Sequence, residues 1–253
     1  YNRAVPRRAR VHRAARSPSG TDAPCARSMA PPLPMPTPLL ANLNPEQLEA
    51  VTLPHGSALV LAGAGSGKTR VLTTRIAWLL ATGQASPLSV LAVTFTNKAA
   101  REMLLRLSTL TPMSVRGMWI GTFHGLCNRM LRAHHRDANL PQLFGILDTA
   151  DQLSLIKRMY KAHNLDDDRF PPKQLGWFIA SAKDAGLRPS AVEAGDEFAR
   201  RQVEHYALYE AMCQREGVVD FAELLLRSYE LLRDHDAVRE HYQRRFRHIL
   251  IDE

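Results

Sequence analysis

Cysteine and long apolar runs are both scarce in this 253-residue sequence. No apolar stretch is long enough to cross a bilayer as a helix. The three cysteines, Cys25, Cys127 and Cys213, lie far apart and form no C-x-x-C pair. They therefore predict a reducing compartment, without a disulfide framework or a zinc site. The length allows one large domain or two small domains with a real core.

Acidic residues are almost absent from residues 1–40, which hold seven arginines and one acid, Asp22. This segment carries +6 of the formal net charge of +8, so the rest carries only +2 and overall charge does not argue for DNA binding. Its Arg, Pro, Ala and Ser content predicts disorder. We expect the residues before Met29, the first methionine, to be upstream translation or an artefact. An organellar transit peptide is the alternative, although its prolines would interrupt a long amphipathic helix.

A glycine-rich segment directly follows the apolar run 57–61, and its residues are Ala62, Gly63, Ala64, Gly65, Ser66, Gly67, Lys68 and Thr69. A strand, a glycine-rich turn and a helix that begins with Lys-Thr form the arrangement that cradles a nucleoside triphosphate. Lys68 can reach the β- and γ-phosphates, and the Thr69 hydroxyl can bind Mg²⁺. We count Arg70 with these nucleotide-binding residues. The alternative is a surface turn that binds nothing, and Ala62 stands where the strict pattern has glycine.

Strand and helix patterns alternate along the first half of the chain. Strands are expected at 57–61, 90–95 and 118–123, and helices from Lys68 and over 97–107. An earlier helix should begin with Asn44 as N-cap. This alternation predicts a parallel sheet with right-handed crossovers. From about residue 125 to 245 the pattern is helical without strands, so a helical domain is expected inside an α/β domain.

Two acids, Asp252 and Glu253, follow the apolar run 248–251. A buried strand that ends in two acids suits a Walker B strand. Asp252 would then hold the Mg²⁺ shell, and Glu253 would polarise the attacking water. Taken alone, the pair is explained equally well by two solvated carboxylates. The phosphate loop upstream is what favours the catalytic interpretation.

The ends of the second and third strands have similar chemistry. Thr94, Phe95, Thr96, Asn97 and Lys98 close the second strand, and Gly121, Thr122, Phe123 and His124 close the third. A ring can stack on a base while polar groups hold phosphates, which suits single-stranded nucleic acid. Spacing alone nevertheless favours a structural interpretation, a core Phe followed by a helix N-cap.

The helical region offers three weaker features. A basic patch could touch duplex phosphates or be a solvated face, and it consists of Arg129, Arg132, His134, His135 and Arg136. The run Asp166–Asp168 is expected to be a polar loop, since it lacks metal-ligand spacing. Asp220 followed by Glu223 is expected to be a helix N-cap.

Taken in order, these segments closely resemble the UvrD/Rep family of superfamily 1 DNA helicases. The segments that carry the resemblance are 43–47, 62–69, 94–100, 121–124, 219–221 and 251–253. It covers residues 43–253 and implies an α/β fold, a P-loop NTPase with a RecA-like parallel sheet. The ATP-binding domain (1A) would be residues 41–122 and 247–253, and incomplete. An all-helical insertion (1B) would be residues 123–246.

The resemblance also implies an ATP-dependent 3′-to-5′ helicase that moves on single-stranded DNA and unwinds duplex in repair or replication. ATP and Mg²⁺ would be its cofactors, and Gln47 would read the adenine edge. The residues implied to line the DNA track are Thr94, Phe95, Thr96, Asn97, Lys98, Thr122 and His124. The implied partners are single-stranded DNA, its junction with duplex, and repair proteins, with no membrane. A bacterial, cytoplasmic, nucleoid-associated protein is expected.

Helicases of this family need a second RecA-like domain, whose arginines stabilise charge on the γ-phosphate. This sequence stops inside the Asp-Glu box, so we expect the 253-residue chain alone to bind nucleotide weakly and not to unwind DNA. It should also fold poorly, because a sheet edge and a domain interface are exposed. The alternatives are a helicase–nuclease subunit of the same superfamily and a non-catalytic nucleotide- or DNA-binding module.

Overall fold

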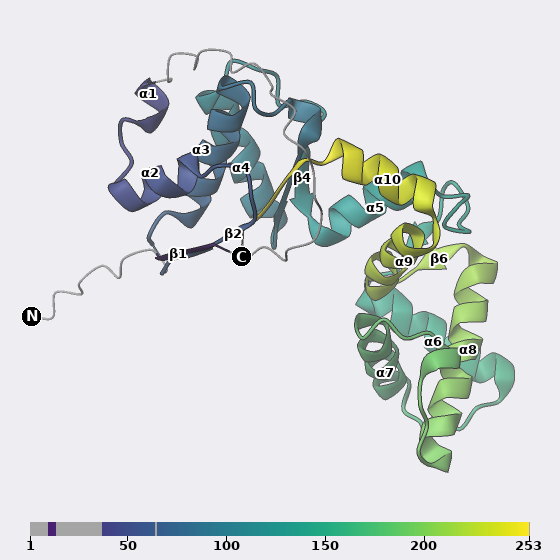
Figure 1. The fold of residues 1–253 in the computed structure, drawn as a ribbon. Helices are drawn as coiled ribbons and strands as arrows, with labels where there is room; N and C mark the ends of the chain where they lie inside the picture. Colours follow the sequence, from purple (N-terminus) through teal and green to yellow (C-terminus); the bar gives the residue numbers. More distant parts are fainter. Residues whose placement is uncertain (1–9, 14–36, 64, 253) are drawn as a thin grey trace, which may run out of the picture. The chain divides into compact units, whose positions relative to one another are not determined.

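The computed structural model describes residues 10–13, 37–63 and 65–252, and the chain divides into two compact units. Unit 1 comprises residues 1–122 and 244–253, and unit 2 comprises residues 123–243 (Figure 1). Ala64 and Glu253, which the sequence assigns to the nucleotide site, lie outside the described residues. So do Cys25 and most of the leader.

Unit 1 contains a three-stranded parallel sheet in the order β4–β3–β7. The central strand β3 (Val90–Thr94) pairs with β4 (Trp119–Thr122) on one side and with β7 (His248–Asp252) on the other. The register sets Thr94 opposite both Thr122 and Asp252, so three strand ends meet at one edge. The parallel sheet is therefore confirmed for these strands, and this is the edge where open α/β sheets bind ligands.

Helices α3 (Lys68–Ala81) and α4 (Asn97–Leu110) pack against this sheet. Their buried side chains recur at helical spacing, as expected, and α4 extends three residues beyond the predicted end at 107. The shared core consists of Ile76, Ala77, Leu80, Val90, Ala92, Met103, Leu107 and Met118. Helix α2 (Pro45–Thr52) packs on α3 and begins with the predicted cap, Asn44. The short helices α1 (Thr37–Leu40) and η1 (Pro87–Ser89) complete the unit.

The strand before the phosphate loop departs from expectation. Among the described residues, β2 (Ala58–Leu61) pairs only with β1 (Arg10–Arg13), in antiparallel orientation. The prediction that 57–61 joins the parallel sheet is thus wrong for the described structure. The prediction of a leader wholly without regular structure is also wrong, because residues 10–13 form β1. An unpaired strand edge offers free N–H and C=O groups, and a nearby segment in extended conformation satisfies them.

Strands β2 and β7 expose apolar side chains that the sequence predicted to be buried. Leu59 and Ile249 are each 60% exposed, and Leu61 and Ile251 are also exposed. The buried-strand prediction for 248–251 is therefore wrong. An apolar run in a strand is buried along its whole length only where other elements cover both faces of the sheet. No described element covers these four side chains.

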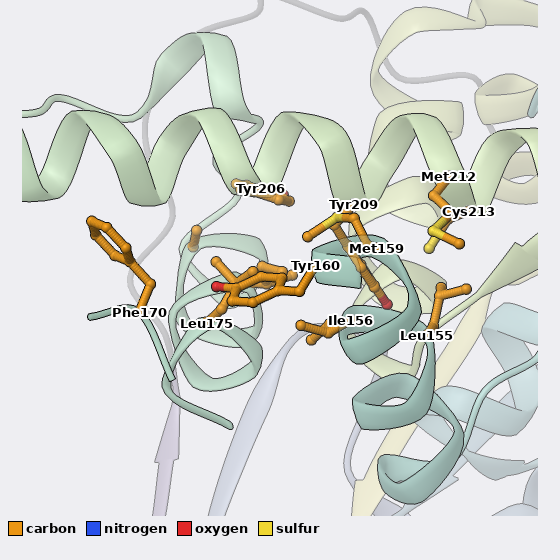
Figure 2. Packing of buried hydrophobic residues seen from close by; sticks show 12 residues of the cluster. Leu155, Ile156, Met159, Tyr160, Phe170, Leu175, Tyr206, Tyr209, Met212 and Cys213 are labelled. Atoms are coloured by element: carbon orange, nitrogen blue, oxygen red, sulfur yellow. The ribbon is translucent and has the colours of Figure 1, made fainter. Parts of the chain in front are cut away.

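Unit 2 is mainly helical and comprises α5 (Phe123–Ala133), α6 (Thr149–His163), α7 (Pro172–Asp184), η2 (Pro189–Ala191), α8 (Glu197–Glu216), α9 (Phe221–Asp234) and most of α10 (Asp236–Arg245). In its core, Tyr206 and Tyr209 of α8 lie over Ile156 and Met159 of α6 (Figure 2). The expected absence of strands is wrong in one detail. β5 (Gly145–Ile146) pairs with β6 (Val218–Val219), and two residues per strand are too few to show an alternating pattern.

A buried ion network links α7, α9 and η2 in unit 2. The Lys183 ammonium lies 2.8 Å from an Asp220 oxygen and 2.9 Å from a Glu223 oxygen. Arg188 also contacts Glu223, at 2.9 Å. Asp220 also accepts the backbone N–H of Glu223, so the predicted N-cap is confirmed. The charged partners that surround this cap were not predicted.

Candidate nucleotide and DNA site

The phosphate loop joins β2 to the N-terminus of α3. Gly65 and Gly67 have φ angles of 76° and 86°, which glycine adopts without strain. The Ser66 hydroxyl donates to the Gly63 carbonyl at 2.7 Å and tightens the turn. The loop therefore ends at a helix N-terminus, where free N–H groups and the helix dipole favour an anion.

Lys68, the first residue of α3, lies back over this loop. Its ammonium donates to the carbonyl oxygens of Ala62 at 3.2 Å and Gly63 at 3.4 Å. Neutral carbonyls are weaker partners for an ammonium than phosphate oxygens, because charge-assisted bonds are stronger. The side chain is thus held in reach of the loop by contacts that a phosphate can replace.

Thr69 and Asp252 meet although 183 residues separate them in the sequence. The Thr69 hydroxyl donates to Asp252 Oδ2 at 2.9 Å. Thr69 lies in the first turn of α3, and Asp252 lies at the end of β7. The pair supplies two hard oxygen donors at one point, which is the chemistry that Mg²⁺ prefers. These residues therefore fit a magnesium ion.

Gln47 connects the start of α2 to the phosphate loop. Its Oε1 accepts the Asn44 backbone N–H at 3.2 Å, and its Nε2 donates to the Ser66 carbonyl at 3.0 Å. Arg70 donates to the Asn42 carbonyl at 2.8 Å. The amide of Gln47 thus lies next to the phosphate loop, and its contact with an adenine base stays a prediction.

Arg75 is a supporting residue that sequence reasoning missed. From α3 it donates to the carbonyls of Val51 at 2.9 Å and Leu53 at 3.0 Å, and so holds the end of α2. Burial lowers the pKa of this guanidinium from its ordinary value. Nothing in the sequence distinguishes Arg75 from a surface arginine, because its carbonyl partners come from another helix.

At the end of β3 the structure separates residues that the sequence grouped together. Thr94 is buried, while the Thr96 hydroxyl accepts the Ala99 N–H at 3.1 Å and caps α4. Phe95 lies between them with 78% of its surface exposed. The structural interpretation therefore holds for Thr96 and is wrong for Phe95, which is no core residue. Asn97 and Lys98 are also exposed.

In unit 2, the exposed His124 lies beside a ring that the sequence analysis did not assign to a site. The ring of His124 meets Phe221 edge-on, with centroids 5.7 Å apart. Phe221 is the first residue of α9 and is 48% exposed. A large aromatic directly after an N-cap residue, at the start of an amphipathic helix, is the signal that could have marked it.

Two members of the basic patch contact other residues of unit 2. The guanidinium of Arg132 lies 3.6 Å from the centre of the Phe144 ring, and it donates to the Phe144 carbonyl at 2.7 Å. His134 packs edge-on against Tyr242. These two side chains have partners within unit 2, and whether the patch contacts duplex phosphates or is a solvated face stays a prediction.

Asp166 accepts backbone N–H groups from Asp168 and Arg169, which confirms the predicted polar turn. In the described part of the chain, no cluster of three or more His, Cys, Asp or Glu is placed to hold a metal. No described helix combines the length and the apolar character that crossing a membrane requires.

Comparison with known proteins gives a consistent result. A family model described as the UvrD/REP helicase N-terminal domain matches residues 43–253. DNA helicase II of Escherichia coli K12 is 55% identical over 216 residues, and that of Haemophilus influenzae is 55% identical over 220 residues. ATP-dependent DNA helicase PcrA of Bacillus subtilis is 42% identical over 217 residues. Each match covers 85% of this chain and 29–30% of the relative, so the chain spans less than a third of their length.

Proposed function

The chain belongs to the UvrD/REP helicase family, and from this we propose that it is the N-terminal part of an ATP-dependent DNA helicase. The full protein would move 3′-to-5′ on single-stranded DNA and unwind duplex during repair or replication. It would act in the bacterial cytoplasm at the nucleoid. The observation that carries the proposal is the Thr69–Asp252 hydrogen bond, because it joins the phosphate loop to the acidic strand end.

In this proposal the nucleotide binds at the N-terminus of α3. Loop N–H groups and Lys68 would hold its phosphates, Gln47 would contact its base, and Arg70 is counted among the residues that bind it. Thr69 and Asp252 would hold Mg²⁺, and Glu253 would orient the attacking water. A bound Mg²⁺ would neutralise charge on the β- and γ-phosphate oxygens.

We assign unit 1 to an incomplete RecA-like domain, residues 41–122 and 247–253, and unit 2 to a helical insertion, residues 123–246. Exposed polar groups and the Phe95 ring support a DNA contact on unit 1, and the His124–Phe221 pair supports one on unit 2. Hydrolysis and movement are proposed for the full-length protein. The 253-residue chain alone is proposed to bind nucleotide weakly and not to unwind DNA.

The test uses the full-length protein that contains this chain. ATP hydrolysis should rise when single-stranded DNA is added, and Lys68→Ala should lower it by ~10²-fold or more, because phosphate stabilisation is lost. Lys157→Ala, an exposed lysine of α6, serves as the control and should retain full turnover. Absence of DNA stimulation would point to a non-catalytic binding module. ATP turnover that survives Lys68→Ala would also refute the proposal of an ATP-dependent helicase.

A further inference from the structure

Two side-chain contacts connect strand β7 to the part of the chain that carries the phosphate loop. At the carboxyl end of β7, Asp252 accepts the Thr69 hydroxyl at 2.9 Å. At its amino end, the ring of His248 lies against the ring of His55, with centroids 5.9 Å apart. His55 belongs to the connection between α2 and β2. In the described part of the chain β2 and β7 share no ladder of backbone hydrogen bonds, so this link depends on side chains.

The second partner of His248 decides which nitrogen of its ring carries the proton. Nε2 lies 3.2 Å from the carbonyl oxygen of Gln84, a residue that follows α3. A carbonyl oxygen only accepts, so Nε2 must donate, and Nδ1 is the atom that a second proton would occupy. That second proton would place a positive charge on a half-buried side chain.

The side chains around His248 are cationic or can become so. His55 lies beside it, Arg75 acts on it from α3, and Arg247 precedes it in the chain. Hydrogen bonds to the carbonyls at the end of α2 hold Arg75 in place. Among the described residues, none of these four side chains forms an ion pair with an acid. Burial lowers the pKa of His248 from its ordinary value of 6.5, and the three neighbouring cations lower it further, while the Gln84 carbonyl opposes them.

We propose that His55 and His248 form a proton-sensitive latch at the amino end of β7. Neutral rings pack together and hold the segment before β2 against this strand. Protonation of both rings separates them, because two cations that also face Arg75 and Arg247 repel one another. The opposite end of β7 carries Asp252, so the latch acts on the strand that holds this carboxylate. The latch needs no nucleotide and goes beyond the proposed function.

Hydrogen exchange of the full-length protein, measured by mass spectrometry without nucleotide, tests the latch. A histidine whose pKa is lower in the folded state destabilises the fold as the pH falls below its unfolded pKa, here 6.5. After correction for intrinsic exchange, peptides that cover residues 53–58 and 246–250 should lose protection about tenfold between about pH 7.5 and about pH 5.5, since one pKa unit is a factor of ten. Peptides from α6 and α8 should keep theirs. Unchanged protection of the two latch peptides would overturn the proposal.

Two substitutions at the exposed His55 should act in opposite directions. His55→Phe keeps a ring against His248 but cannot take up a proton, so it should remove most of the pH response. His55→Lys places a charge there at both pH values, so the latch peptides should be poorly protected even at about pH 7.5. His163→Phe, at an exposed histidine of α6, is the matched control and should respond to pH as the parent does.

Equal pH responses in the two phenylalanine variants would contradict the latch, and so would full protection of the lysine variant near pH 7.5. Protection of the α6 and α8 peptides shows in the same experiment that each variant is folded. Because no nucleotide is added, the result is independent of the ATPase test.

Discussion

The exposed position of the Phe95 ring is energetically unfavourable when no DNA is bound. Full burial of such a ring typically stabilises a protein by about 1.5–3 kcal/mol, yet most of its surface faces solvent. It directly precedes Thr96, whose side chain caps α4, so the ring is held on a rigid helix start. Stacking on a nucleic-acid base would recover the lost burial.

Phe95→Ala should therefore weaken single-stranded DNA binding by ~1–3 kcal/mol, the value of one lost stack. Fluorescence anisotropy with a labelled oligonucleotide measures this for the full-length protein. Leu105→Ala removes another exposed apolar side chain, from the middle of α4, and should leave affinity unchanged. Equal losses in both variants would show that the ring does not stack on DNA.

Among the elements, α7 and α9 depend on the charges buried between them. Burial would raise the pKa of Glu223, but Lys183, Arg188 and Arg227 outweigh it and hold the pKa at about 2. A carboxyl whose pKa is lower in the folded state stabilises the fold above its unfolded pKa. This contribution is therefore complete at neutral pH and is lost as the pH falls from about 4.5 toward 2.

Glu223→Gln should destabilise unit 2 by ~3–5 kcal/mol at neutral pH, because it leaves Lys183 buried with weaker compensation. Hydrogen exchange of peptides from α7 and α9 should become faster in this variant, and less dependent on pH below 4.5 than in the parent chain. The control, Glu204→Gln, breaks an exposed pair with Arg201 and should cost at most ~1 kcal/mol. If the two variants behave alike, the network does not hold these helices together.

For the whole molecule, the uncovered apolar strands matter most. Leu59, Leu61, Ile249 and Ile251 are exposed on β2 and β7, whereas a soluble monomer rarely exposes a large apolar patch. The curated relatives are nearly three times as long as this chain, since each match covers 85% of the chain and 29–30% of the relative. We propose that the additional length of the full protein covers these strands.

The 253-residue chain should consequently self-associate, and the full-length protein should not. Sedimentation velocity over a concentration series measures this. Ile249→Thr with Ile251→Thr should shift the chain toward monomer, whereas Leu143→Thr, at a position of unit 2 that is 89% exposed, should have little effect. A parent chain that stays monomeric at every concentration would contradict the expectation.

Local features of this protein follow from its sequence alone. The glycine-rich loop, the Asn44 cap of α2 and the apolar stripe of α3 depend on residues within a few positions of one another. Backbone conformation and capping are decided at that range, so the strand–loop–helix of the phosphate site could be predicted. The same reasoning identified Asp252 by type, from the apolar run before it.

Tertiary structure alone decided which distant groups meet. The Thr69–Asp252 bond, the pairing of β2 with β1, the exposure of Phe95 and the burial of Lys183 beside Glu223 depend on strand register and helix packing. Which arrangement forms depends on how much surface each alternative packing would bury, and residues from the whole chain contribute to that difference. No local pattern in the sequence carries that information.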